Sequence, residues 1–128
     1  MALSISLSDG EWKLMNLLWE SAPRTITQLV KALADDTGWS KATVLVMLRR
    51  MEQKGAVTFE QSGRSKQYFP SVPKDGIAVA ETESFLQKVY GGSLGLLVSS
   101  MATQKALSKK EIDELYEILK KAEEESEQ

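Results

Sequence analysis

The sequence predicts a mainly α-helical chain with one small β-hairpin, divided into an N-terminal domain at residues 1–72 and a helical region at 73–128. Two observations support this fold class. Apolar residues recur at the helical spacing i, i+3, i+4, i+7 in most of the chain, and a period of two replaces it only within 57–69. Pro70 and Pro73 then flank a short segment that disfavours both helix and strand, which marks the domain boundary.

The first helix is expected to begin after Ser8, because Ser8 and Glu11 have the spacing of a capping box. Its apolar residues are too numerous for one stripe, so it should be buried on more than one side. A second helix follows after a short gap. Thr25 or Thr27 is its expected cap, and residues 35–38 close it.

The third helix is predicted between Ser40, a favourable N-cap, and Gly55, which can end a helix in the left-handed conformation. One apolar stripe runs along it, formed by Val44, Met47, Leu48 and Met51. The other face mixes cations, a hydroxyl and small or medium apolar groups, which is unusual for a face that meets only water. Two helices joined by so short a turn, the second basic and half exposed, are typical of a helix-turn-helix.

A β-hairpin is expected after the third helix. Residues 57–61 alternate in polarity, Lys66, Tyr68 and Phe69 form a second short strand, and Gly63 suits the turn between them. Three helices followed by a hairpin are the order of a winged helix-turn-helix domain. A short strand near residues 24–26 could complete the sheet.

Three further helices are predicted in the C-terminal region, from Lys74 to Tyr90, from Leu94 to about Met101, and after the capping box that begins at Ser108. So few residues rarely hold a core alone, and a second copy of the chain is the simplest partner. We therefore expect a homodimer. The expected dimerisation residues are Phe85, Val89, Leu94, Leu97, Val98, Met101, Ile112, Leu115 and Leu119.

The composition excludes several classes of function. The chain has no cysteine and no histidine, so it lacks thiolate metal sites, the commonest metal ligand and the commonest catalytic base. We expect no enzyme activity, no cofactor and no metal. No apolar run has the length of a membrane span, and no secretion signal begins the sequence. A cytoplasmic protein without membrane insertion is therefore expected.

The charge is unevenly distributed along the chain. The net charge is −2, yet residues 39–69 carry six cations and two acids, a local balance of +4. From residue 71 onward, seven lysines face eleven acids, which leaves −4. A basic head on an acidic body is the pattern expected of a protein that binds double-stranded DNA.

The third helix and the hairpin tip supply the expected DNA-binding residues. They are Ser40, Lys41, Ala42, Thr43, Leu45, Val46, Arg49, Arg50, Arg64 and Lys66. Hydroxyls and cations can hydrogen-bond base edges or phosphates, whereas the apolar members can only contact thymine methyl groups. Arg50 has a second interpretation, an ion pair with a carboxylate of the first helix. The exposed Leu45 and Val46 leave open another class of function, an adaptor that binds a polypeptide through this helix.

Five short motifs occur in a fixed order. They are Leu7-Ser8-Asp9-Gly10-Glu11-Trp12 with Met15 and Trp19, Trp39-Ser40 with Thr43-Val44, Arg50-Met51 with Lys54-Gly55, Gly63-Arg64 with Tyr68, and Val89-Tyr90-Gly91-Gly92 followed by Leu107-Ser108. In this order and spacing the chain resembles the BlaI/MecI/CopY family of bacterial winged-helix repressors. The resemblance implies a dimer on a palindromic operator, typically in front of β-lactam-resistance or copper-handling genes. The copper branch binds metal through a cysteine motif, which this chain lacks.

The resemblance also implies a mode of control. In the β-lactam branch, a membrane-bound sensor metalloprotease system causes cleavage within the dimerisation helices, and alignment places that cut at Ser100-Met101. Positions 42, 45 and 46 are often polar or basic in that branch and are apolar here, which implies a different operator. A family repressor of unrelated target genes is therefore the alternative.

Overall fold

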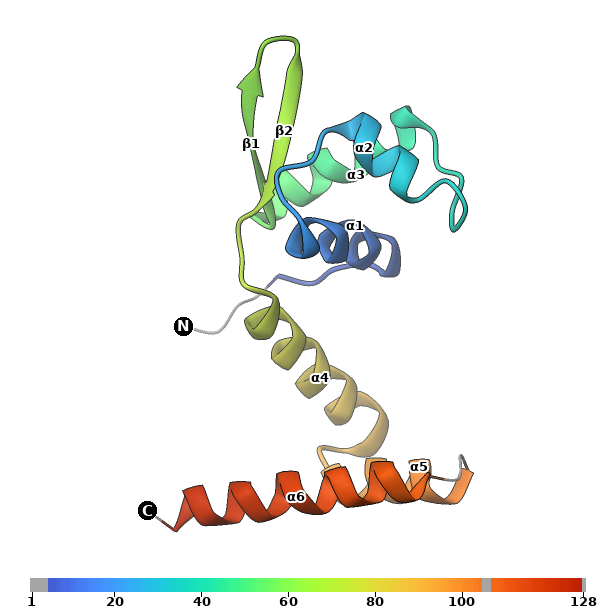
Figure 1. Cartoon of the computed structure of the whole chain (residues 1–128), viewed down its shortest axis with the longest axis vertical. Coiled ribbons are helices and arrows are strands. Elements are labelled where there is room, and N and C mark those ends of the chain that lie inside the picture. The colour runs from blue at the N-terminus through green and yellow to red at the C-terminus, as the bar shows by residue number, and fades with distance from the viewer. Residues whose placement is uncertain (1–4, 105–106, 128) are drawn as a thin grey trace. The chain divides into compact units, whose positions relative to one another are not determined.

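The computed structural model describes residues 5–104 and 107–127 (Figure 1). The outermost residues of the two predicted domains, 1–4 and 128, lie outside this range. The elements in chain order are α1 (Asp9–Glu20), α2 (Ile26–Ala32), α3 (Lys41–Lys54), β1 (Val57–Ser62), β2 (Ser65–Pro70), α4 (Lys74–Tyr90), α5 (Leu94–Gln104) and α6 (Lys109–Ser126). The predicted mainly α-helical winged helix-turn-helix fold is confirmed.

The helices of the N-terminal half begin where their caps predict. Ser8 and Glu11 form the capping box of α1, with Ser8 N donating to Glu11 Oε1 at 2.8 Å. Thr25, rather than Thr27, caps α2 and forms a second capping box with Gln28. At the end of α3, Gly55 has φ 84°, a left-handed conformation that favours glycine.

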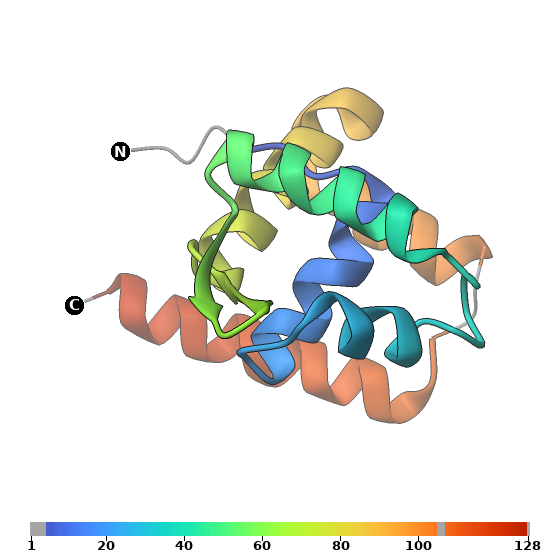
Figure 2. The same cartoon turned by 90° about the horizontal axis from the view of Figure 1, so that it is seen from above.

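The core of the N-terminal half lies between α1, α2, α3 and the hairpin. Figure 1 shows α2 and α3 on one side of α1, with the hairpin next to them, and in the view of Figure 2 α1 lies between α2 and α3. The buried apolar side chains are Leu7, Leu14, Met15, Leu18, Leu29, Leu33, Val44, Leu48, Met51, Ala56, Val57, Tyr68 and Ile77. α1 supplies three of them, together with a half-buried pair of tryptophans, Trp12 and Trp19, whose rings are 5.8 Å apart. All apolar residues of α1, too numerous for one stripe, are therefore buried or half-buried.

β1 and β2 pair in antiparallel register from Val57 opposite Pro70 to Ser62 opposite Ser65. Gly63, with φ 62°, takes the left-handed position in the tight turn. The strand expected near residues 24–26 is a single bridge, in which Arg24 N donates to Tyr68 O at 3.2 Å and Tyr68 N donates to Arg24 O at 2.9 Å. This bridge ties the hairpin to the segment just before α2.

The chain divides into two compact units, 1–82 and 83–128. The division falls within α4, because Ile77 at the start of this helix is only 2% exposed and belongs to the core of the first unit. Val72 is attached to the same core, where its carbonyl accepts a hydrogen bond of 2.9 Å from Trp19 Nε1. The prolines that predict a boundary at 72/73 therefore end the hairpin, while the next helical turns still pack on the first unit.

The second unit consists of the remainder of α4 with α5 and α6, and it exposes many apolar side chains. α6 opens with the predicted capping box of Ser108 and Glu111. Among the described residues, neither α5 nor α6 has a buried side chain. None of the described helices is both long enough and apolar enough to span a membrane.

Candidate nucleic-acid interface

Local hydrogen bonds organise the start of α3. Ser40 Oγ accepts from Thr43 N at 3.2 Å and also donates to Thr43 Oγ1 at 3.2 Å. The hydroxyl proton of Ser40 is thus directed to Thr43, while Thr43 keeps its own proton for an outside acceptor. Of these two residues, Thr43 is therefore the better placed to donate to an outside acceptor, and Ser40 acts mainly as the helix cap.

The exposed face of α3 carries most of the predicted DNA-binding residues. Leu45 is half-buried. The exposed residues are Ser40, Lys41, Ala42, Thr43, Val46, Arg49 and Arg50. The opposite face buries Val44, Leu48 and Met51 in the core, with Met47 half-buried beside them. This burial sets the rotation of the helix about its axis. Val46, although apolar, is 52% exposed.

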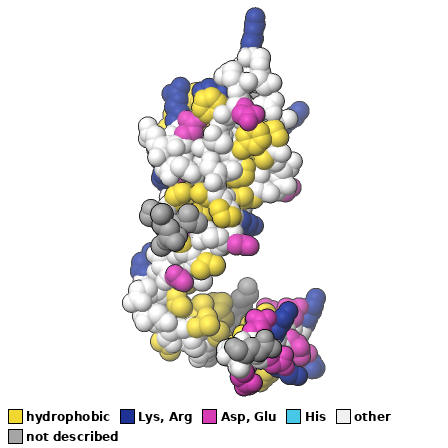
Figure 3. Space-filling model, turned by 90° about the vertical axis from the view of Figure 1, so that its left-hand side faces the viewer, with side chains coloured by type: hydrophobic (Ala, Val, Ile, Leu, Met, Phe, Trp, Pro, Cys, Tyr) yellow, Lys and Arg dark blue, Asp and Glu magenta, His cyan; other side chains and the backbone are white. Residues whose placement is uncertain are grey.

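A groove of about 490 Å³ opens between the start of α2, α3 and the hairpin. Six of the predicted residues line it, namely Lys41, Ala42, Leu45, Arg49, Arg64 and Lys66. Four cations from two distant parts of the chain therefore share one concave surface. Figure 3 shows a basic side chain at the tip of the hairpin. Ser40, Thr43, Val46 and Arg50 lie outside the lining of this groove.

Five residues that line the groove were not among the predicted DNA-binding residues. They are Thr25, Ile26, Thr27, Gln61 and Ser65. The residues before and at the start of α2 reach the groove because the bridge between Arg24 and Tyr68 holds this segment beside the hairpin. The strand expected near residues 24–26 anticipates this neighbourhood, but no local pattern shows that the side chains of this segment line the groove.

Tyr68 connects the hairpin to α3. Burial raises the pKa of its hydroxyl, the nearby Glu52 carboxylate raises it further, and the Arg49 guanidinium opposes both effects. Arg49 is itself exposed and lines the groove. The buried Tyr68 of β2 therefore lies close to two charged residues of α3, Glu52 and Arg49.

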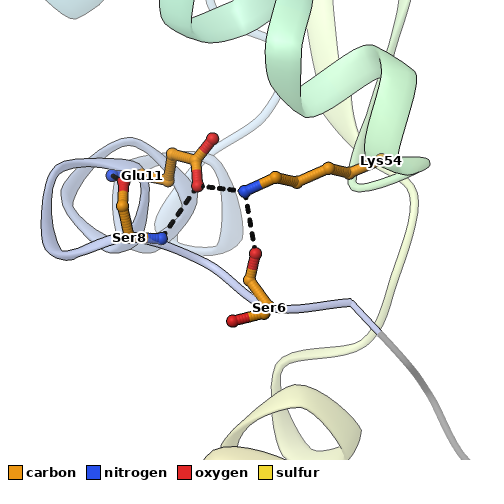
Figure 4. Close-up of polar contacts among 4 residues, drawn as sticks. All are labelled: Ser6, Ser8, Glu11 and Lys54. Carbon is orange, nitrogen blue, oxygen red and sulfur yellow. Dashed lines mark hydrogen bonds and ion pairs between the residues drawn. The ribbon is translucent and has the colours of Figure 1, made fainter.

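The pairing of Arg50 with the first helix is not observed. The ion pair with α1 is made by Lys54, whose ammonium lies 2.6 Å from Glu11 Oε1 (Figure 4). Within the described ranges, no carboxylate lies in ion-pair distance of Arg50. Arg50 is exposed, one helical turn before Lys54. Its side chain is thus available to an outside anion.

The second unit carries the predicted dimerisation residues, most of them at its surface. Phe85, Val89, Leu94, Val98, Met101, Ile112 and Leu119 are exposed, and Leu97 and Leu115 are half-buried. α5 and α6 enclose an apolar groove of about 480 Å³ to which Leu97, Met101 and Leu115 contribute. Figure 3 shows hydrophobic side chains at the surface of this unit beside charged ones. This unit also exposes three apolar residues that were not among the predicted dimerisation residues, namely Leu96, Tyr116 and Ile118.

The part of the chain that the structure describes contains no candidate metal-binding site. No three of its Asp and Glu side chains gather closely enough to hold a metal ion. The arrangement instead offers positive charge on a concave surface and hydrogen-bond donors on the exposed face of α3. These groups are suited to phosphate oxygens and base edges.

The fold and this surface define a winged helix-turn-helix protein of the DNA-binding repressor class. A model of the penicillinase repressor family matches residues 7–121. The chain belongs to that family, which is one of DNA-binding transcriptional repressors rather than of enzymes.

Individual relatives are similar over most of their length. The penicillinase repressor of Bacillus licheniformis is 32% identical over 113 residues, which are 88% of each chain. The methicillin resistance regulatory protein MecI of Staphylococcus aureus is 28% identical over 115 residues, 90% of this chain and 94% of MecI. The predicted kinship with the BlaI and MecI repressors is thus confirmed.

Solved structures agree with the fold. The DNA-binding domain of the repressor BlaI superposes with a TM-score of 0.52 at 28% identity, covering 59% of this chain and 93% of that domain. The same values hold for monomeric BlaI of Bacillus licheniformis in complex with the blaP half-operator. A MarR variant of E. coli, 20% identical with a TM-score of 0.52, covers 91% of this chain and supports the fold alone.

Proposed function

We propose that this chain is a homodimeric, cytoplasmic transcriptional repressor that binds a palindromic operator and controls genes of the β-lactam-resistance type. The observation that carries the proposal is the groove in which Lys41 and Arg49 of α3 meet Arg64 and Lys66 of the hairpin. Cations from a helix and from a wing on one concave surface match the phosphates that flank a DNA groove.

In this proposal α3 enters the major groove and the wing contacts phosphates. Thr43 and Lys41 read base edges by hydrogen bonds, while Ala42, Leu45 and Val46 contact thymine methyl groups. The monomeric BlaI that is solved with a half-operator supports a mode in which one winged helix occupies one half-site. Two half-sites would then lie about one helical turn, roughly 34 Å, apart.

A second copy of the chain is the proposed partner of the second unit. Its exposed apolar residues on α5 and α6 have no core of their own to fill. Burying such side chains between two copies removes them from water and provides the driving force for association. A two-fold dimer also presents two reading helices, which suits a palindromic site.

Release of the operator is proposed to follow cleavage at Ser100-Met101 by a membrane-bound sensor metalloprotease system. The peptide bond lies inside α5, where Ser100 is half-buried and Met101 is 41% exposed. A protease that binds an extended substrate would have to unwind α5 locally. The cut would separate α6 from the DNA-binding domain and so weaken the dimer.

Gel-shift titration tests the proposal with a palindromic duplex that the full-length protein selects from a random-sequence pool. Arg64→Ala combined with Lys66→Ala should weaken binding and reduce the slope of log affinity against log salt by about two, since each phosphate contact contributes roughly 0.9. Lys120→Ala combined with Lys121→Ala on α6 is the matched control, because it removes the same charge from residues that do not line the groove.

Three results would contradict the proposal. One is the absence of any selected duplex at moderate salt, which would favour the adaptor that binds a polypeptide. Another is an unchanged salt slope in the groove variant. The last is an equal loss in the α6 control, which would show that net charge alone is responsible.

A further inference from the structure

An aromatic side chain next to the groove contacts one of its cations. The Lys66 ammonium lies 4.2 Å from the centre of the Phe59 ring. In the hairpin register Phe59 lies opposite Tyr68 and Gln61 lies opposite Lys66, so Phe59 and Lys66 are diagonal neighbours on one face of the sheet. Their contact is therefore a consequence of strand pairing, and it is a cation–π interaction.

The Phe59 ring is itself attached to the core. It lies 5.8 Å from the ring of Tyr68, tilted by 48°, and Tyr68 is only 1% exposed. The two backbone hydrogen bonds between Tyr68 and Arg24 hold that residue in place. Phe59 is 37% exposed, so one part of its ring packs inward while the rest can meet Lys66. A chain of contacts thus runs from the core to the ammonium.

The held ammonium keeps its hydrogen-bonding capacity. A lysine carries three N–H donors, and no described hydrogen bond or ion pair uses those of Lys66. Lys66 also lines the groove with Lys41, Arg49 and Arg64. A free lysine loses rotamer entropy when it binds a phosphate, and a lysine already held in place loses less.

We propose that Phe59 is a positioning residue for DNA binding, whose ring holds the Lys66 ammonium in the groove, ready to meet a backbone phosphate. This inference rests on the proposed function. It goes beyond that function because it assigns a role to an aromatic residue that lines no part of the groove. The role depends on the aromatic ring rather than on hydrophobic bulk, which makes it testable by conservative substitution.

The test measures the affinity of full-length variants for the duplex selected by the wild-type protein, over a salt series. Phe59→Leu should weaken binding about two- to fivefold, the range of an exposed cation–π contact. It should also lower the salt slope toward that of Lys66→Ala. Phe59→Tyr keeps the aromatic ring and should bind as the wild type does. Because Phe59 acts through Lys66, the double variant Phe59→Leu, Lys66→Ala should bind no more weakly than Lys66→Ala alone.

A matched control separates positioning from general damage to the hairpin. Phe69 neighbours Tyr68 on β2 and points to the other face of the sheet, so Phe69→Leu removes the same atoms without touching Lys66. Its salt slope should equal that of the wild type, and circular dichroism should show the same helix content for all variants.

Additive losses in the double variant, a wild-type salt slope in Phe59→Leu, or a loss in Phe59→Tyr equal to that in Phe59→Leu would overturn the inference and leave the proposed function intact. A wild-type protein that selects no duplex would overturn both.

Discussion

Lys54 and Glu11 form an ion pair of 2.6 Å that joins the end of α3 to the start of α1 (Figure 4). Glu11 is completely buried, whereas the Lys54 side chain is 32% exposed. The same ammonium donates to Ser6 O at 2.8 Å, and Glu11 Oε1 also accepts from Ser8 N at 2.8 Å. One cation therefore connects α3, α1 and the segment that precedes α1.

Replacing Lys54 should destabilise the first unit. Lys54→Met keeps most of the aliphatic stem but leaves a buried carboxylate without its cation, so we expect a loss of about 1–3 kcal/mol in the free energy of unfolding. Arg50→Met on the same helix is the control, and a change within about 0.5 kcal/mol is expected because Arg50 is exposed. Urea denaturation measures both values. Equal losses in the two variants would contradict this role of Lys54.

The ion pair should also make stability depend on pH in the acid range. Burial acts to raise the pKa of Glu11, but the hydrogen bond and charge of Lys54 and the hydrogen bonds with Ser8 outweigh it and leave the pKa below its ordinary value of 4.5. A carboxylate with a lowered pKa contributes stability that is present above its unfolded pKa. That contribution is lost as the pH falls through the folded pKa.

Glu11→Gln isolates this effect. The stability difference between the wild type and Glu11→Gln should be constant at neutral pH and should shrink as the pH falls below about 4.5. Thermal unfolding at a series of pH values measures it. A difference that stays constant down to the lowest pH at which the protein folds would show that Glu11 carries no such contribution. Asp113→Asn is a useful comparison, because its ion pair with Lys109 is exposed.

A side chain at Gly10, in the first turn of α1, should crowd two neighbouring side chains. A Cβ there would lie 2.8 Å from Met47 Cε and 3.1 Å from Trp39 Cη2, so Met47 and the indole that precedes α3 would have to move. We expect Gly10→Ala to cost about 1–2 kcal/mol, in the range of overpacking. Gly95→Ala in the first turn of α5 is the control, since its Cβ would meet only Ser93 Oγ at 3.8 Å. An unchanged melting temperature in Gly10→Ala would contradict this packing.

Loss of the last helix should abolish the proposed dimer. A chain that ends at Ser100 lacks α6 and should sediment as a monomer, because the exposed apolar residues of α6 provide much of the proposed contact. A chain that ends at Glu123 keeps Ile112, Tyr116 and Leu119 and should remain dimeric. Analytical ultracentrifugation distinguishes the two states. A dimer formed by the shorter chain would contradict the proposal, and so would a monomeric full-length protein.

The order and the ends of the helices and the hairpin can be predicted from the sequence, because they depend on local chemistry. Ser8, Ser40 and Ser108 cap helices through hydrogen bonds to residues three positions later, and Gly55 ends α3 through its own conformation. The apolar stripe of α3 likewise predicts which face is buried. The family resemblance is carried by these same local motifs.

Contacts between residues far apart in the sequence depend on how the elements pack, which local patterns do not show. Arg50 and Lys54 lie one turn apart on α3, and the packing of α1 against α3 selects Lys54 as the partner of Glu11. Ile77 joins the first core because the start of α4 packs against it, a contact that the two prolines do not reveal. The contact of Phe59 with Lys66 depends in the same way on strand register, which local periodicity does not define.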